Sequence, residues 1–199
     1  MKTLLLLAVL GAASLAAQTA AQTAAQTAPV PATTPQPQNT AGKDPNLEGI
    51  WEGYDGEWDH VSRQLIALSQ AIPEEKYMWR PAKGVRSVSE VFMHIAIANF
   101  YLLSVTGPKM PADITSDEQE KTVTSKAQVI GFLERSLAAV KTARAQLKPG
   151  DLERHVKIQG KTVTVDGMYL RIIVHDNEHM GQLVAYARMN GIVPPWSKP

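Results

Sequence analysis

Apolar residues recur at helical spacing in four long segments of the chain. In the first segment they alternate in steps of four and three, at Leu47, Trp51, Tyr54, Trp58, Val61, Leu65, Leu68 and Ile72. Asp44 and Pro45 supply an N-cap and a proline at the first helical position, and Pro73 stops the pattern. The segment therefore predicts an amphipathic helix with one continuous apolar face.

Two further helices begin with capping signals. Ser87 and Glu90 form a Ser-x-x-Glu capping box, and the helix after them extends to Gly107. Ser125, followed three residues later by Gln128, opens a third helix that ends near residue 147. The apolar faces of these helices carry Val91, Ile95, Ala98 and Leu102 in one, and Ile130, Leu133, Leu137, Val140 and Leu147 in the other.

The last part of the chain predicts a short hairpin and a fourth helix. Residues 154–165 alternate between apolar and polar around Gly160, which indicates two short strands. A helix follows from about Asp166 to Asn190, with Gly191 as its C-cap. Four amphipathic helices with a long connection at residues 107–124 are typical of an all-α four-helix bundle, with a short β-hairpin before helix four.

The N-terminal residues do not fit this pattern. Residues 1–17 have the apolar run and small residues of a secretory signal peptide, so we expect an exported protein, periplasmic or extracellular. Residues 18–43 are rich in Ala, Gln, Thr and Pro and predict a disordered tether, although the Ala-rich part could also be transiently helical. The remaining residues, 44–199, predict one folded domain, and no membrane-spanning segment is expected after signal cleavage.

Composition narrows the possible chemistry. The chain has no cysteine, which excludes disulfides, thiolate metal ligands and a cysteine nucleophile. The formal net charge is +1, from 20 basic and 19 acidic residues scattered along the chain, so nucleic acid is not an expected partner. Any metal must therefore be held by nitrogen or oxygen ligands.

Two histidines of the fourth helix are placed to share a metal ion. His175 and His179 are four residues apart, so their side chains lie about 40° apart on the helix, one turn along. On the same helical wheel they fall among the apolar residues Met168, Ile172, Leu183 and Tyr186. Two imidazoles on a buried face need partners, which are either nearby carbonyls and carboxylates or a metal ion.

A third histidine comes from the second helix. His94 lies on the rim of that helix's apolar face, close to Ala98 and Val91 on the wheel. Together with His175 and His179 it predicts a three-histidine site with one open coordination position, which is the arrangement of catalytic zinc. Imidazole ligands favour a divalent transition metal, with zinc, nickel or iron expected here. The other two histidines, His60 and His155, are interpreted as surface residues.

Further polar residues flank the histidine pair. The sequence His175 to His179 also matches His-x-x-Glu-His, in which Glu178 would be the base of a metallopeptidase, but residues 180–199 contain no Asp, Glu or His to complete that site. A third ligand must then lie upstream. Glu178 is predicted either to act as a base or ligand-orienting group, or to be a solvated carboxylate. Arg171 and Gln182 lie on the same flank and are candidates for binding substrate.

Three stretches carry a family resemblance: residues 77–87, 90–96 and 175–191. The pattern resembles the DinB-like (damage-inducible) family, over residues 47–196. The resemblance implies a four-helix bundle whose metal ligands are His94, His175 and His179. It also implies relatives that include thiol-dependent S-transferases of the bacillithiol and mycothiol type. The predicted export is a departure from those enzymes, because low-molecular-weight thiols belong to the reducing cytosol.

Three functions are compatible with this sequence. The first is an exported metal-dependent hydrolase or transferase acting on a small molecule. The second is a non-catalytic envelope module that binds a metal or small ligand, and the third is a structural bundle whose histidines satisfy one another through water. The aromatic residues of the first helix also suit a homodimer partner.

Overall fold

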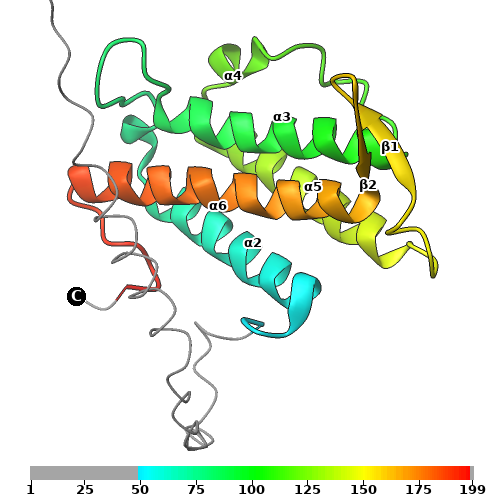
Figure 1. Ribbon diagram of the computed structural model, residues 1–199. Helices are drawn as coiled ribbons and strands as arrows, with labels where there is room; N and C mark the ends of the chain where they lie inside the picture. Colours follow the sequence, from blue (N-terminus) through cyan, green and yellow to red (C-terminus); the bar gives the residue numbers. More distant parts are fainter. Residues whose placement is uncertain (1–48, 198–199) are drawn as a thin grey trace, which may run out of the picture. The chain divides into compact units, whose positions relative to one another are not determined.

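The computed structural model describes residues 49–197, which form a bundle of four long helices with a small hairpin at one end (Figure 1). The long helices are α2 (Gly53–Ala71), α3 (Val88–Thr106), α5 (Lys126–Ala145) and α6 (Val165–Met189). The shorter elements are η1 (Glu74–Lys76), α4 (Gln119–Thr122), β1 (His155–Ile158) and β2 (Lys161–Thr164). The all-α prediction, with a hairpin before the last helix, is confirmed.

Each long helix packs on two others. α3 lies beside α5 and α6, and α2 packs against the same two helices (Figure 1). α2 and α3 are therefore diagonal to each other. The hairpin contacts α3 through β1 and α6 through β2, and α4 lies against α3. The predicted helices two and four are thus direct neighbours, as a shared histidine site requires.

Helix α2 begins later than predicted. Its buried side chains include Trp58, Val61, Leu65 and Leu68, which belong to the predicted apolar face. Trp51 does not join them: it precedes the helix at φ 74° and is 91% exposed. The chain cannot continue as a helix here because Gly49 and Gly53 also have positive φ values. Asp44, Pro45 and Leu47 lie outside the described residues, as do the predicted signal peptide and tether.

The aromatic residues of α2 are mostly used inside the bundle. Trp58 is 2% exposed and its indole nitrogen donates to the carbonyl of Leu137 at 3.3 Å. Tyr54 is partly buried against the ring of Tyr169, with centroids 5.7 Å apart. The sequence pattern predicts Trp51, Tyr54 and Trp58 as an aromatic face left free for a partner. Tyr54 and Trp58 are instead used inside the bundle, and of these three residues Trp51 alone is exposed.

Helix α3 is the central helix of the bundle. The predicted capping box is present, because the Glu90 amide donates to the Ser87 hydroxyl and the Ser87 amide donates to the Glu90 carboxylate. Buried residues are found all around α3 rather than on one stripe, since α4, α5, α6 and the hairpin all contact it. Length and composition alone would let α3 cross a membrane, but 67% of that stretch is buried inside the bundle.

The ends of the other two helices differ slightly from the sequence pattern. Ser125 precedes α5 but makes no side-chain capping bond, so the second predicted capping box is wrong. α6 is capped by Thr164, whose hydroxyl accepts from the Gly167 amide at 3.1 Å. Gly191 follows its C-terminal end at φ 74°, the left-handed conformation expected of glycine there.

Candidate metal centre

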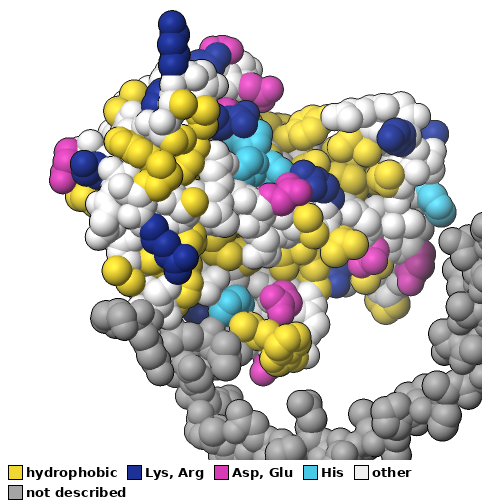
Figure 2. Space-filling model, turned by 60° about the vertical axis from the view of Figure 1, so that its left-hand side comes forward, with side chains coloured by type: hydrophobic (Ala, Val, Ile, Leu, Met, Phe, Trp, Pro, Cys, Tyr) yellow, Lys and Arg dark blue, Asp and Glu magenta, His cyan; other side chains and the backbone are white. Residues whose placement is uncertain are grey.

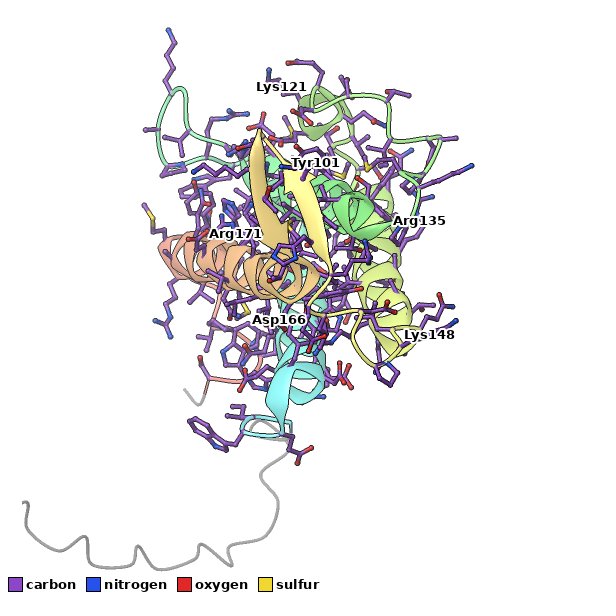
Figure 3. The ribbon with its side chains drawn as sticks, turned by 45° about the vertical axis from the view of Figure 1, so that its right-hand side comes forward. Tyr101, Lys121, Arg135, Lys148, Asp166 and Arg171 are labelled. Atoms are coloured by element: carbon purple, nitrogen blue, oxygen red, sulfur yellow. The ribbon has the colours of Figure 1, made fainter. Side chains whose placement is uncertain are left out.

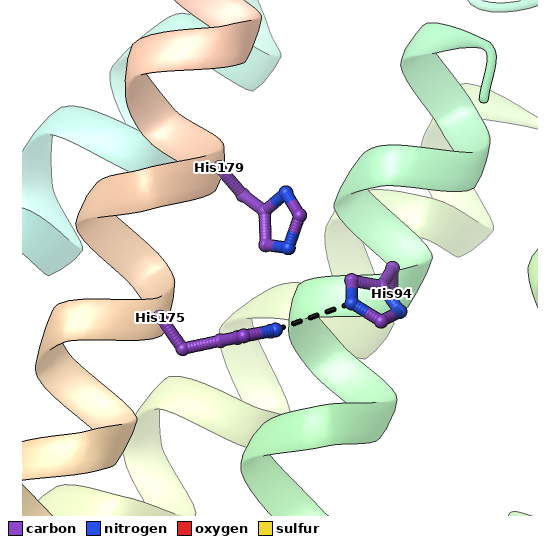
Figure 4. Close-up of side chains that lie close together, drawn as sticks. All are labelled: His94, His175 and His179. Carbon is purple, nitrogen blue, oxygen red and sulfur yellow. Dashed lines mark hydrogen bonds between the residues drawn. The ribbon is translucent and has the colours of Figure 1, made fainter. Parts of the chain in front are cut away.

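Three imidazoles converge between α3 and α6. His94 projects from the middle of α3 toward His175 and His179, which lie one turn apart on α6 (Figure 4). One ring nitrogen from each residue can be chosen so that all three lie within 4.8 Å of one another. The Nε2 atoms of His94 and His175 are 3.1 Å apart. Two nitrogen ligands of a tetrahedral zinc ion lie about 3.3 Å apart, since each Zn–N bond is about 2.0–2.1 Å.

The other ring nitrogens face oxygen atoms. The Nδ1 atom of His94 lies 2.5 Å from a carboxylate oxygen of Glu120. The Nδ1 atom of His179 lies 2.9 Å from the side-chain oxygen of Gln182. A carboxylate accepts hydrogen bonds and does not donate them when ionised, so His94 carries its proton on Nδ1. Its Nε2 atom then presents a lone pair to the centre of the cluster.

A chain of hydrogen bonds fixes the orientation of Gln182. The Tyr186 hydroxyl donates to the backbone carbonyl of Arg86 at 3.3 Å, so it must accept from the Gln182 amide group at 2.7 Å. The amide oxygen of Gln182 is therefore the atom that faces His179. His179 also carries its proton on Nδ1, and its Nε2 lone pair is free for a metal.

His175 has a carboxylate next to it but no hydrogen bond to it. Its Nδ1 atom is 3.9 Å from a carboxylate oxygen of Asp176, which is too long for a hydrogen bond. Both atoms are buried, and neither has a partner among the described residues. The other Asp176 oxygen accepts from the amide of Asn99 at 3.1 Å. A proton on the Nδ1 atom of His175 would face the Asp176 oxygen that has no partner, and it would leave the Nε2 atom of His175 free.

Burial and neighbouring groups shift the pKa of His179, Glu120 and Asp176. Burial lowers the pKa of His179, and the neighbouring His175, His94 and Arg86 lower it further, against the hydrogen bond to Gln182. The ring is therefore held neutral, the form that binds metals. Burial alone would raise the pKa of Glu120, but hydrogen bonds from His94 and Arg86 outweigh it and lower that pKa. Asp176 is fully buried, and burial raises its pKa.

The predicted residues differ in how they relate to the cluster. Gln182 contacts His179 directly. Glu178 instead accepts a hydrogen bond from Arg171 at 3.1 Å, and both side chains are about half exposed. In the described part of the chain neither of these two hydrogen-bonds to a histidine. The hydrogen bond from Arg171 holds the pKa of Glu178 below its usual value, and His175 and His179 are near enough to lower it further.

Sequence reasoning missed two site residues. Glu120 lies on α4, inside the segment expected to be a plain connection, and it is the buried residue of that short helix. Nothing in the local pattern indicates that it reaches His94, which is 26 residues away. Asp176 is different, because the helical wheel places it about 100° from His175, on the core side of α6. The position of Asp176 on the helical wheel therefore indicates a carboxylate beside His175, although the His-x-x-Glu-His pattern favours Glu178 instead.

Two cavities adjoin the cluster. One, of about 570 Å³, is lined by His94 together with residues of α3, of the α4 region and of the hairpin turn. The other, of about 650 Å³, is lined by Arg86, Glu120 and Gln182 among others. Figure 2 shows histidine side chains at the surface of this face, and their largest group lies between acidic and basic side chains. His60 and His155 lie elsewhere, partly exposed and exposed respectively.

Comparison with known proteins gives a consistent family assignment. A model of the DinB superfamily matches residues 57–183, well over half of the chain. A DinB-like protein from Bacillus cereus ATCC 10987 has a TM-score of 0.65 and 22% identity, over 74% of this chain and 97% of that one. A DinB-like protein from Bacillus subtilis has a TM-score of 0.56 and 16% identity, over 73% and 99%. No curated protein matches in sequence. At these identities the solved structures are informative about the fold alone.

Proposed function

The chain belongs to the DinB superfamily, and we propose that His94, His175 and His179 hold a divalent transition metal that acts on a small molecule. The observation that carries this proposal is the convergence of the three rings, two of which, His94 and His179, turn their Nδ1 atoms to oxygen acceptors and so leave their Nε2 atoms free to bind. Without a cation, two lone pairs 3.1 Å apart would repel each other unless one ring moved its proton. Zinc, nickel and iron are the metals that this donor set favours.

The chain's own residues would prepare the site in two ways. Glu120 and Gln182 each accept a hydrogen bond from an Nδ1–H group, which fixes the ring orientation of His94 and His179. Three protein ligands would leave a coordination position open, and a metal held there would lower the pKa of a water molecule to about 7 or polarise a bound group. We propose hydrolysis or group transfer on this basis, with thiol transfer as one possible reaction class.

Metal content tests the first part of the proposal. Untagged full-length protein offered zinc, nickel and iron in turn should bind about one equivalent of at least one metal, measured by elemental analysis. His175→Ala should lose this binding, whereas His60→Ala, a histidine outside the cluster, should keep it. A stoichiometry near zero for all three metals, or unchanged binding in His175→Ala, would contradict the proposal.

The ion pair of Glu178 favours a second candidate function. Because Arg171 already holds this carboxylate, it is less available as a base, and a non-catalytic module that binds a metal or ligand at the cell envelope fits that contact. Turnover by the metal-loaded protein on ester, amide, phosphoester and thiol-transfer substrates separates the two functions. If turnover is found, Glu178→Gln should lose most of the rate only if Glu178 is the base. The export on which an envelope role depends would be tested by locating the mature protein in cell fractions.

A further inference from the structure

The cavity beside His94 has an apolar wall that continues away from the histidine cluster. On α3, Ala98 lies about 40° and Tyr101 about 20° from His94 around the helix, so the three side chains follow one line. Seven residues of helix span about 10 Å. Tyr101 is 44% exposed, which is unusual for a large aromatic side chain in a bundle, and it lines this cavity together with Ala98 and Ile97.

The opposite side of the cavity is built by two segments that are distant in sequence. Gln159, at the turn of the hairpin, lines it from one side. Gln159 and Gly160 both have positive φ values, 48° and 76°, as a tight two-residue hairpin turn requires. Lys121 and the acidic residues before it line it from the α4 region. Figure 3 shows Tyr101 beside the hairpin, with Lys121 above it on α4.

The charges around the cavity disfavour an anionic ligand. Lys121 is paired with Glu118 at 2.9 Å, and Arg86 is paired with Glu120 at 2.8 Å. Asp117 has no side-chain partner among the described residues, and it lines the same cavity. The charges of Lys121 and Arg86 are therefore already paired, and the exposed carboxylate of Asp117 adds a negative charge to the cavity wall.

We propose that this cavity is a substrate subsite for the tail of a small molecule whose head binds the metal. The tail is apolar or aromatic, about 10 Å long, and carries no negative charge. The cavity's volume of about 570 Å³ lies within the range of small-molecule sites, about 300–1,000 Å³. The subsite rests on the proposed function for its metal-binding head, but the tail contacts α3 and the hairpin turn, and Asp117 disfavours a negative charge on it.

Hydroxamic acids of different tails test the subsite, because their head groups bind transition metals directly. Calorimetry on the metal-loaded full chain would compare acetohydroxamate, benzohydroxamate and 4-carboxybenzohydroxamate. Benzohydroxamate should bind about tenfold tighter than acetohydroxamate, and the added carboxylate should cancel much of this gain. Tyr101→Ala should reduce the gain by about two- to tenfold. Met189→Ala, which removes an apolar side chain that is 64% exposed at the far end of α6, should not.

The effect of the Asp117 charge on binding is tested with a variant and a matched control. Asp117→Asn should improve binding of 4-carboxybenzohydroxamate, whereas Glu134→Gln, on the exposed face of α5, should leave it unchanged. Equal affinity of acetohydroxamate and benzohydroxamate would overturn the subsite while leaving metal binding intact. If the metal-loaded protein bound neither compound, the open coordination position and the proposed function would be wrong instead.

A measurement without metal keeps the two proposals separate. Benzamide, which has the ring but no strong metal-binding head, should shift the amide NMR signals of Tyr101 and Gln159 in the metal-free full chain. Signals of α5 residues such as Glu134 should stay in place. Shifts confined to residues outside the cavity would overturn the subsite whatever the protein's metal content.

Discussion

Replacing Glu120 by glutamine is the sharpest test of how this centre is organised. The carboxylate is 10% exposed and accepts from both His94 and Arg86. Glutamine keeps the shape and one oxygen acceptor but removes the charge. Because the Arg86 side chain is 43% exposed, solvent screens that pair, and most of the effect should come through the more shielded His94.

The expected loss can be worked from the two bonds. Mutation of a group that orients a metal-ligating histidine weakens metal binding by about 10- to 100-fold, or about 1.4–2.7 kcal/mol. In the metal-free protein a charge-assisted hydrogen bond of about 1.5–3 kcal/mol becomes a neutral one of about 1 kcal/mol. The variant should therefore remain folded, with a free energy of unfolding lower by about 1 kcal/mol and with a weaker site.

The assay is a chelator competition that measures the zinc Kd of the full-length protein, with urea unfolding of the metal-free form alongside. Glu118→Gln is the matched control, because it removes a charge from the same region. The Glu118 side chain is 71% exposed, and among the described residues its one ion pair is with Lys121. An unchanged Kd in Glu120→Gln would refute the assigned role. Equal weakening in both variants would refute it too, since the effect would then be general electrostatics.

Three other predictions follow from the same packing. The pKa of His179 is lowered in the fold, so the unfolded chain binds more protons at this residue. Metal-free protein should therefore lose stability as pH falls below about 6.5. Between pH 8 and pH 5 the Tm of His179→Gln should fall less than that of the unchanged protein. Leu65→Ala, at a fully buried position, should cost about 2–5 kcal/mol in urea unfolding, against within about 0.5 kcal/mol for the exposed Trp51→Ala. Asp176→Asn should stabilise metal-free protein by about 1–3 kcal/mol, because a buried oxygen without a partner loses its charge. The same change should weaken zinc binding through His175. A variant that lost both stability and zinc affinity would contradict this reasoning.

Much of the fold could be predicted because helix rules are local. The steps of four and three along α2, the capping box of α3 and the hairpin around Gly160 all appear where the sequence indicates them. The start of α2 could not be predicted in the same way. Trp51 adopts a positive φ, which is rare for a bulky residue, and spacing alone placed it on the helix. The glycines of the entry segment decide the outcome there, because Gly49 and Gly56 lie so close that a side chain on either would meet the backbone of the other.

The histidines differ in the same way, since two of them follow from local helix geometry and the third depends on tertiary packing. His175 and His179 are paired by helix geometry alone, so their spacing was sufficient. His94 needed a further assumption, that α3 packs beside α6, which the apolar pattern and the family resemblance supplied and the packing confirms. Ala98, its neighbour on the wheel, is only partly buried, which agrees with a rim position next to a cavity rather than with a core stripe.

The side-chain oxygen atoms that lie next to the three rings show where local rules stop. Gln182 is three residues from His179 and Asp176 is next to His175, so α6 itself carries both. Glu120 reaches His94 only because residues 107–124 fold back over α3. Glu120 and Gln182 each fix the orientation of one ring by accepting a hydrogen bond from it. The connection that the sequence presents as a simple linker is therefore the part of the fold where changes can alter metal affinity without disturbing any long helix.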